Sequence, residues 1–412
     1  MSVPAAAGAV PFGPPGAYGR SRRGPVPLRF ASMSDRTLDL DDFSDLIERP
    51  NGGLRRDAEA RRARSGVPPQ ALGRLDELGE WLTAAQRRLP VAPVRSAKLV
   101  VFAGDHGVAE AGVSSRAAGS AHTLVREALD GVSPAALLAR RAGVPLRVVD
   151  MSLDCEPSEF PEELTRLRVR RSSGRLDVED TLTEEEAERA FRAGMAVADE
   201  EADGGTDLVV LGDLSVGGTT AAGALVAALC GTDASVVTGR GGARIDDVAW
   251  MRKCAAIRDG LRRARPVLGD QLALLATLGG ADLTAITGFL LQSAVRRTPV
   301  ILDGVVSAAC ALVGQRVAFR APDWWLAGQV SGEPAQEKAL DRLAMDALLD
   351  QRVRVGGGTG ALLALPLVEA AAELAAGLPA ADGRDGSAGS EGSGDSEGAA
   401  GAGPGAGLVD AT

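Results

Sequence analysis

The feature that most constrains the fold is an alternation, along the middle of the chain, of short β-rich runs with alanine-rich stretches of helical pattern. Six runs predict strands, at residues 98–103, 146–151, 208–211, 234–237, 300–302 and 324–327. The stretches between them predict helices at residues 118–142, 183–202, 219–228, 247–264 and 283–297. This alternation is typical of an α/β fold with a doubly wound, mainly parallel sheet. In such sheets ligands bind at the carboxyl ends of the strands.

The two ends of the chain differ in composition from its middle. Residues 1–37 are rich in Pro, Gly, Ser and Arg, and residues 378–412 contain hardly any bulky apolar side chain. Neither segment can bury enough apolar surface to fold, so we expect a disordered leader and a disordered tail around a core at 38–377. Met33 is an alternative translation start, because the patterned chain begins just after it.

A small helical domain is expected beside the sheet. Residues 66–89 have the pattern of an amphipathic helix, and with residues 39–47 they are expected to pack on the last helix of the core. The small domain would then be built from N-terminal core segments, within 38–95, and from the C-terminal end of the core.

Composition and charge exclude several classes of function. The net charge of −10 argues against nucleic acid as a partner. Four scattered cysteines and two histidines argue against a Cys/His metal site, and we expect no metal and no cofactor. The chain contains no run of 18 uncharged apolar residues and no signal-peptide pattern, so we expect no membrane span and a cytoplasmic protein.

Two glycine loops lead into predicted helices. The first contains Gly358 and Thr359 and precedes an apolar helical run, and the second is Gly217-Gly218-Thr219-Thr220, after a buried strand. A helix start presents unpaired N–H groups and a partial positive charge, which together can bind an anion. The alternatives are a tight turn for the first loop and an N-cap role for Thr219 in the second. Neither loop is a P-loop, because no Gly-Lys-Thr occurs.

Other candidates lie at further predicted strand ends and beside them. Gly239, Arg240 and Gly241 form a turn with positive charge, and with Lys253 they suit phosphate. Asp303 is placed either to touch a ligand or to cap a helix.

The Asp105-His106 pair follows the first strand and could act on a ligand or could make structural hydrogen bonds within its loop. These two interpretations carry equal weight.

Taken in order, these segments resemble the nicotinate-nucleotide–dimethylbenzimidazole phosphoribosyltransferase family. The resemblance covers about residues 66–375. Seven segments carry it, at residues 68–75, 103–108, 211–220, 239–253, 302–304, 331–334 and 358–362.

The resemblance implies a parallel α/β sheet with a small helical domain, assembled as a homodimer. It implies transfer of the phosphoribosyl group of nicotinate mononucleotide to a nitrogen of a benzimidazole base, a step of cobalamin lower-ligand synthesis that needs no metal. It also implies that the nucleotide phosphate binds at Gly217–Thr220, at Gly239–Gly241, at Lys253 and at Ser331.

The chain departs from the family pattern where the aromatic base is bound and deprotonated. Gly357 occupies the position of the family's general base, a glutamate, and Asp213 replaces the family's second acidic residue. Residues 116–122 differ from the family's base-pocket segment, and Gly328-Gln329 replaces its Ser-His pair. Asp213 is therefore the best remaining carboxylate for acid–base chemistry.

Two hypotheses follow. The first is a phosphoribosyltransferase with altered base specificity or a substitute base, and the second is a non-catalytic protein that binds a nucleotide or regulates a partner. A Rossmann-type dehydrogenase is disfavoured, because no G-x-G-x-x-G follows the first strand.

Overall fold

The computed structural model describes residues 38–68, 70–242 and 244–379. Contacts divide the chain between Asp39 and Leu40, and the fold described below is that of the part from Leu40 onward. The predicted leader, at 1–37, and all but the first two residues of the predicted tail lie outside the described residues.

A five-stranded parallel sheet organises this part of the chain. Its strands are β1 (Ala97–Asp105), β2 (Leu146–Ser152), β3 (Leu208–Val216), β4 (Val300–Leu302) and β5 (Trp325–Ala327). They lie in the order β2-β1-β3-β4-β5, and all four neighbouring pairs are parallel. The strand order reverses between β1 and β3, and in doubly wound sheets such a switch point is where ligands bind.

Helices connect and cover these strands. They are α1 (Asp42–Leu46), α2 (Gly52–Ala63), α3 (Arg74–Gln86), α4 (Ala121–Leu129), α5 (Pro134–Ala142), α6 (Glu162–Thr165), α7 (Glu184–Asp203), α8 (Gly218–Cys230), α9 (Ala234–Val237), α10 (Asp247–Ala264), α11 (Gln271–Leu278), α12 (Gly280–Val295), α13 (Val305–Val317), α14 (Pro334–Leu343) and α15 (Thr359–Gly377). Short 3₁₀ turns are η2 (Gly107–Ala111), η3 (Pro157–Glu159), η4 (Arg265–Val267) and η5 (Ala321–Trp324).

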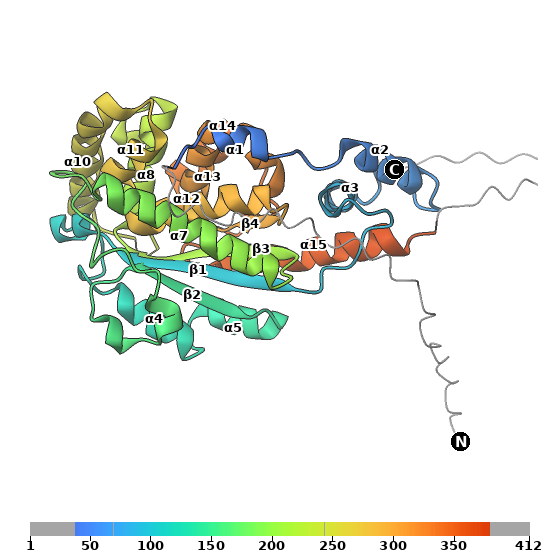
Figure 1. The fold of residues 1–412 in the computed structure, drawn as a ribbon, viewed down its shortest axis with the longest axis horizontal. Coiled ribbons are helices and arrows are strands. Elements are labelled where there is room, and N and C mark those ends of the chain that lie inside the picture. Colours follow the sequence, from blue (N-terminus) through green and yellow to red (C-terminus); the bar gives the residue numbers. More distant parts are fainter. Residues whose placement is uncertain (1–37, 69, 243, 380–412) are drawn as a thin grey trace, which may run out of the picture. The chain divides into compact units, whose positions relative to one another are not determined.

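Two groups of helices cover the two faces of the sheet (Figure 1). On one face lie α7 and α12, and the rings of Phe102 on β1 and Phe289 on α12 meet edge to face at 5.5 Å. All 16 residues of α12 are buried. The helix can lie this deep because α7 approaches it backbone to backbone, and a Cβ at Gly194 would lie 1.8 Å from the Ala285 carbonyl oxygen. On the other face, α4, α5 and α15 pack with the sheet in one apolar cluster.

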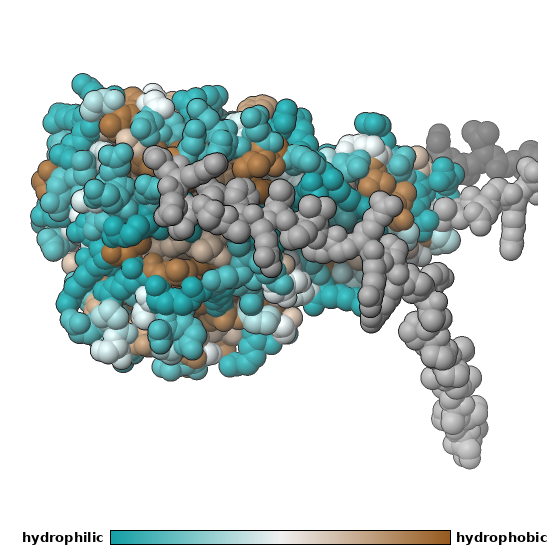
Figure 2. Space-filling view, viewed as in Figure 1, coloured by the Kyte–Doolittle hydropathy of each residue, from teal (hydrophilic) through white to brown (hydrophobic). Residues whose placement is uncertain are grey.

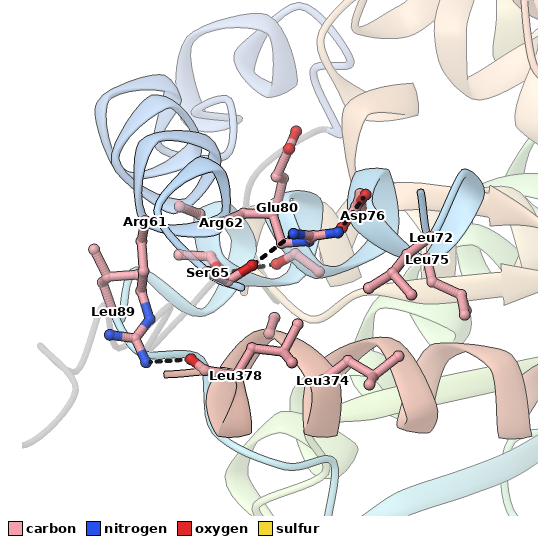
Figure 3. A pocket seen from close by; sticks show the side chains of 14 residues that line it. Arg61, Arg62, Ser65, Leu72, Leu75, Asp76, Glu80, Leu89, Leu374 and Leu378 are labelled. Atoms are coloured by element: carbon pink, nitrogen blue, oxygen red, sulfur yellow. Dashed lines mark hydrogen bonds and ion pairs between the residues drawn. The ribbon is translucent and has the colours of Figure 1, made fainter. Parts of the chain in front are cut away.

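The small helical domain consists of α2, α3 and the C-terminal half of α15. A Cβ at Gly79 of α3 would lie 2.8 Å from that of Ala375 on α15, so these helices touch closely. Figure 3 shows the small cavity between them, of about 30 Å³. Beside it, Arg61 donates hydrogen bonds to the carbonyl oxygens of Ala376 and Leu378, at 3.4 and 3.2 Å.

Two local predictions were wrong, and a third needs correction. Residues 39–47 do not join the small domain, because Phe43 of α1 packs on Phe191 of α7 with ring centroids 5.8 Å apart. Residues 234–237 form a single helical turn, closed by the Thr238 hydroxyl on the Ala234 carbonyl oxygen at 2.6 Å. The helix expected at 118–142 is two helices, because Ser133 caps α5 and Pro134 begins it. The other five predicted strands are confirmed.

One helix, α15, is long and apolar enough to cross a membrane by length and composition alone. It is instead a core helix of this fold, since Leu365, Val368 and Ala372 are fully buried in the apolar cluster. Figure 2 shows a mostly hydrophilic face on which apolar residues gather in small groups. Scattered apolar residues of this kind are usual on protein surfaces.

Candidate active site

A cavity of about 310 Å³ opens at the carboxyl ends of β3 and β4. Of the predicted site residues, those that line it are Asp213, Gly217, Thr219, Thr220, Arg240, Gly241, Lys253, Asp303 and Ser331. Gly218 lies between two lining residues, and the other predicted site residues do not line the cavity. Its lining is mixed, and besides polar groups it includes the apolar side chains of Val113, Leu124, Leu214, Ile245, Val305, Val306, Val353 and Val355. Such a lining suits a ligand with a charged part and a flat apolar part.

The polar part of the cavity lining is built around the start of α8. Gly217, with φ +94°, turns the chain into this helix. The N–H groups of Gly218 and Thr219 have no hydrogen-bond partner among the described residues. Because the N-terminus of a helix carries a partial positive charge, these N–H groups are suited to hold an anion.

A buried cation lies beside these N–H groups. Lys253 is 2% exposed, and its ammonium group donates to the Thr219 hydroxyl at 2.8 Å. Burial lowers the pKa of Lys253 to about 8, against the opposing pull of the Glu333 carboxylate. The neighbouring Thr220 hydroxyl is buried without a hydrogen-bond partner in the described chain. An anion in the cavity would satisfy both the cation and the free donors.

The start of α15, by contrast, is already occupied. Asp303 accepts hydrogen bonds from the N–H groups of Gly358, Gly360 and Ala361 at 3.0, 2.8 and 3.0 Å. The preceding glycines have φ between +68° and +83°, which residues with side chains rarely adopt. The anion at this helix start is therefore the chain's own carboxylate, and neither Gly358 nor Thr359 lines the cavity.

The Gly239–Gly241 turn also holds an internal carboxylate. The Gly241 N–H donates to Glu333 at 3.0 Å, and a Cβ at Gly239 would lie 1.8 Å from a Glu333 oxygen. Arg240 pairs with Asp247 at 2.5 Å, while Arg354 donates to the Ser331 carbonyl oxygen at 2.9 Å. The sequence interpretation missed Glu333 and Arg354, although the Arg-Val-Arg-Val pattern at 352–355 could have indicated that one face of that segment is cationic.

Asp213 is the carboxylate best placed for acid–base chemistry. One oxygen accepts the Ser215 hydroxyl at 3.0 Å, and the other has no hydrogen-bond partner among the described residues. Burial, followed by the nearby Asp303 carboxylate, raises the pKa of Asp213 to about 7. Burial also raises the pKa of Asp303 to about 6, although its three N–H donors favour the charged form. A carboxylate with a pKa near neutrality can both take up and release a proton under physiological conditions.

The backbone at Gly357 accommodates a side chain poorly. Its φ is +68°, and a Cβ there would lie 3.2 Å from Ala135 and 3.4 Å from Leu214. Its N–H donates to the Asp213 carbonyl oxygen at 2.8 Å, so the loop lies directly on β3.

The Asp105-His106 pair lies behind the cavity wall. Asp105 accepts the N–H groups of Ala121 and Asp154, at 3.0 and 2.9 Å, and so joins two loops. His106 pairs with Asp282, a partner that the sequence interpretation did not identify. No group of three or more residues that could hold a metal ion occurs within residues 38–68, 70–242 and 244–379.

A parallel doubly wound sheet with a free helix start and a buried lysine at its carboxyl edge is an arrangement suited to binding phosphate. A family model described as phosphoribosyltransferase matches residues 47–382. Enzymes named nicotinate-nucleotide–dimethylbenzimidazole phosphoribosyltransferase are similar to this chain. The one from Streptomyces avermitilis is 76% identical over 83% of this chain and 92% of its own length. The one from Mycobacterium avium is 46% identical over 79% and 92%.

The fold is similar to a solved structure as well. The crystal structure of the same-named enzyme from Thermus thermophilus has a TM-score of 0.73 and 34% identity, over 79% of this chain and 96% of that one. The chain therefore belongs to the nicotinate-nucleotide–dimethylbenzimidazole phosphoribosyltransferase family. The family expected from the seven segments, and its α/β fold, are confirmed.

Proposed function

We propose that the protein transfers the phosphoribosyl group of nicotinate mononucleotide to a nitrogen of a benzimidazole-type base, as a step of cobalamin biosynthesis. The products are α-ribazole phosphate and nicotinate. The observation that carries the proposal is the joint presence, on one cavity, of an unoccupied helix start with Lys253 and of the Asp213 carboxylate. The names of the relatives support the same reaction.

The nucleotide phosphate would bind at the start of α8. There it would accept hydrogen bonds from the free N–H groups and from the ammonium group of Lys253, and Thr220 would supply a hydroxyl. Charge-assisted hydrogen bonds of this kind are stronger than neutral ones. The Gly239–Gly241 turn would contribute only if Glu333 moved away from it.

The acceptor base would lie against the apolar side chains that line the cavity. Its unprotonated nitrogen attacks the anomeric carbon, the bond to nicotinate breaks, and the pyridinium ring leaves with the bonding electron pair as nicotinate. The ring N–H proton of the acceptor passes to the free oxygen of Asp213. The departing ring is already cationic, so the main work of the protein is to position the acceptor and to take this proton.

The second candidate function is nucleotide binding without transfer. It is favoured by Gly357, which supplies no carboxylate, and by the altered segment at 116–122, from which Arg116 lines the cavity. Under either function we propose a homodimer, as the family resemblance implies, and a cytoplasmic location.

The test is to incubate the protein with nicotinate mononucleotide and a panel of benzimidazoles, purines and phenols, and to separate the products by chromatography. Nicotinate and a ribosyl phosphate adduct should appear together. Asp213→Asn should lower kcat by roughly 10²–10⁴-fold, whereas the exposed Asp350→Asn should leave it unchanged. Nucleotide binding by calorimetry, without product from any acceptor, would instead establish the non-catalytic function.

A further inference from the structure

A buried ion pair lies directly behind the cavity wall and is not used by the reaction as described so far. The imidazole of His106 lies 3.0 and 3.1 Å from the two carboxylate oxygens of Asp282. His106 is 1% exposed and Asp282 is 0% exposed. The backbone closes over the ring at Gly280, with φ +75°, where a Cβ would lie 2.8 Å from the imidazole. The pair is therefore fixed in place and shielded from water.

This pair is connected to Asp213 through a small group of contacts. The backbone N–H of His106 donates to the Val216 carbonyl oxygen at 3.0 Å, at the end of the strand that carries Asp213. A Cβ at Gly218 would lie 3.4 Å from His106 Nε2 and 2.1 Å from the Ser215 hydroxyl. That hydroxyl in turn donates to Asp213 at 3.0 Å. The imidazole and the hydroxyl thus meet at Gly218, and the hydroxyl contacts the Asp213 carboxylate.

The charges around His106 come from three elements. Asp282 faces it from α12, Asp213 from β3 and Asp105 from the end of β1. Burial lowers the pKa of His106, but the three carboxylates, Asp282 foremost, raise it above the ordinary value.

Two of these charged groups, Asp282 and His106, also affect the pKa of Asp213. Besides the effect of burial, Asp303 and Asp282 raise its pKa, whereas the Ser215 hydrogen bond and His106 lower it. Among the charged groups with the largest effect on the pKa of Asp213, His106 is a cation and Asp303 and Asp282 are acids.

We propose that His106, held by Asp282, is a positioning residue whose positive charge keeps Asp213 ionised and so able to accept a proton. The inference rests on the proposed role of Asp213 as the base. His106 does not line the cavity and touches neither substrate, so it acts through Asp213.

The first experiment is the pH dependence of kcat. His106→Asn leaves Asp282 unpaired near Asp213, so the acid limb of the pH profile should shift to higher pH by about one unit. At pH values below this limb kcat should fall by about tenfold, and at higher pH it should recover. Removing both charges, in His106→Asn/Asp282→Asn, should return the limb toward that of the wild type. The limb staying in place in the single variant would overturn the inference.

The matched control is Glu201→Gln. Glu201 is 2% exposed and pairs with Lys98 and Arg147 at the amino ends of β1 and β2, away from the cavity. This variant also breaks a buried ion pair and should lower the stability without moving the acid limb. If the acid limb also moved in Glu201→Gln, the shift would follow from loss of stability alone, and the inference would be overturned.

The second experiment does not depend on activity. The chain has two histidines, so labelling histidine for NMR gives two ring signals, and His122→Gln assigns them. Because coupling between two sites is reciprocal, Asp213→Asn should make His106 titrate at a lower pH than in the wild type. An unchanged titration would overturn the inference. If no transfer product forms at any pH while this coupling is observed, the proposed function fails and the charge coupling stands.

Discussion

Two helices of this fold begin alike and end up with opposite surroundings. Both α8 and α15 follow a glycine in the left-handed conformation, Gly217 with φ +94° and Gly358 with φ +83°, and both have threonine in the first turn. At α15 three N–H groups bind Asp303, whereas α8 presents free N–H groups and Lys253 to the cavity. The local pattern therefore determines the helix start, and a residue remote in sequence determines whether a ligand can use it.

The two helix starts therefore have different roles beside the cavity. The occupied helix start anchors the loop at Gly356–Gly358 against β3, next to Asp213. The free helix start and Lys253 remain available to bind an anion, whereas N–H groups at the start of α15 and at Gly241 already bind an internal carboxylate.

The largest expected effect on ligand binding comes from removing the cation at the free helix start. Lys253→Met should raise the KM for nicotinate mononucleotide by about 10–150-fold, because a hydrogen bond to a charged group contributes about 1.5–3 kcal/mol. The fold should persist, since methionine is apolar and the site is buried. Lys338→Met, at a half-exposed lysine of α14, is the control and should leave KM unchanged. Equal KM values for the two variants would place the phosphate elsewhere.

The next effect comes from neutralising the carboxylate at the occupied helix start. Asp303→Asn replaces a carboxylate that accepts three N–H groups, so the free energy of unfolding should fall by about 2–3 kcal/mol. Urea denaturation measures this, with the exposed Asp350→Asn as the reference. An unfolding free energy equal to that of the wild type would show that the two helix starts do not differ as described.

The smallest effect concerns the loop itself. Gly357→Glu and Gly357→Gln should each cost about 1–2 kcal/mol of stability, because the backbone there has φ +68°. Only the glutamate adds a carboxylate, so it alone should raise turnover with dimethylbenzimidazole. Thermal unfolding and the product assay, run on both variants, separate strain from chemistry. Similar turnover in the two variants would mean that proton removal does not limit the rate.

Much of this architecture could be predicted from the sequence, and the failures have a common cause. The strands β1 to β5 were recognisable because buried parallel strands form short apolar runs between helical patterns. The turn at 234–237 has the same composition as those strands but lies outside the sheet. Periodicity cannot separate a short buried strand from a short buried helix.

The anion-binding groups of the site could be predicted from the sequence, but the carboxylates that pair with groups elsewhere in the fold could not. Lys253 and Gly217–Thr220 could be found because glycine, threonine and lysine near a helix start indicate an anion. Tertiary packing determines that Asp303 caps α15 and that Asp282 pairs with His106 across 176 positions. Both interpretations of Asp303, as ligand contact or as cap, were open from the sequence, and the structure shows the cap.

The helix α15 is held at both ends by side chains from other parts of the chain. Asp303 receives its first N–H groups, and Arg61 donates to the carbonyl oxygens of Ala376 and Leu378 at its far end. The acid lies at the positive end of the helix dipole and the base at the negative end. Helices ordinarily fray from their termini, whereas the terminal turns of α15 are tied down across its roughly 28 Å length. Its end amides should therefore exchange with deuterium about as slowly as those at its centre.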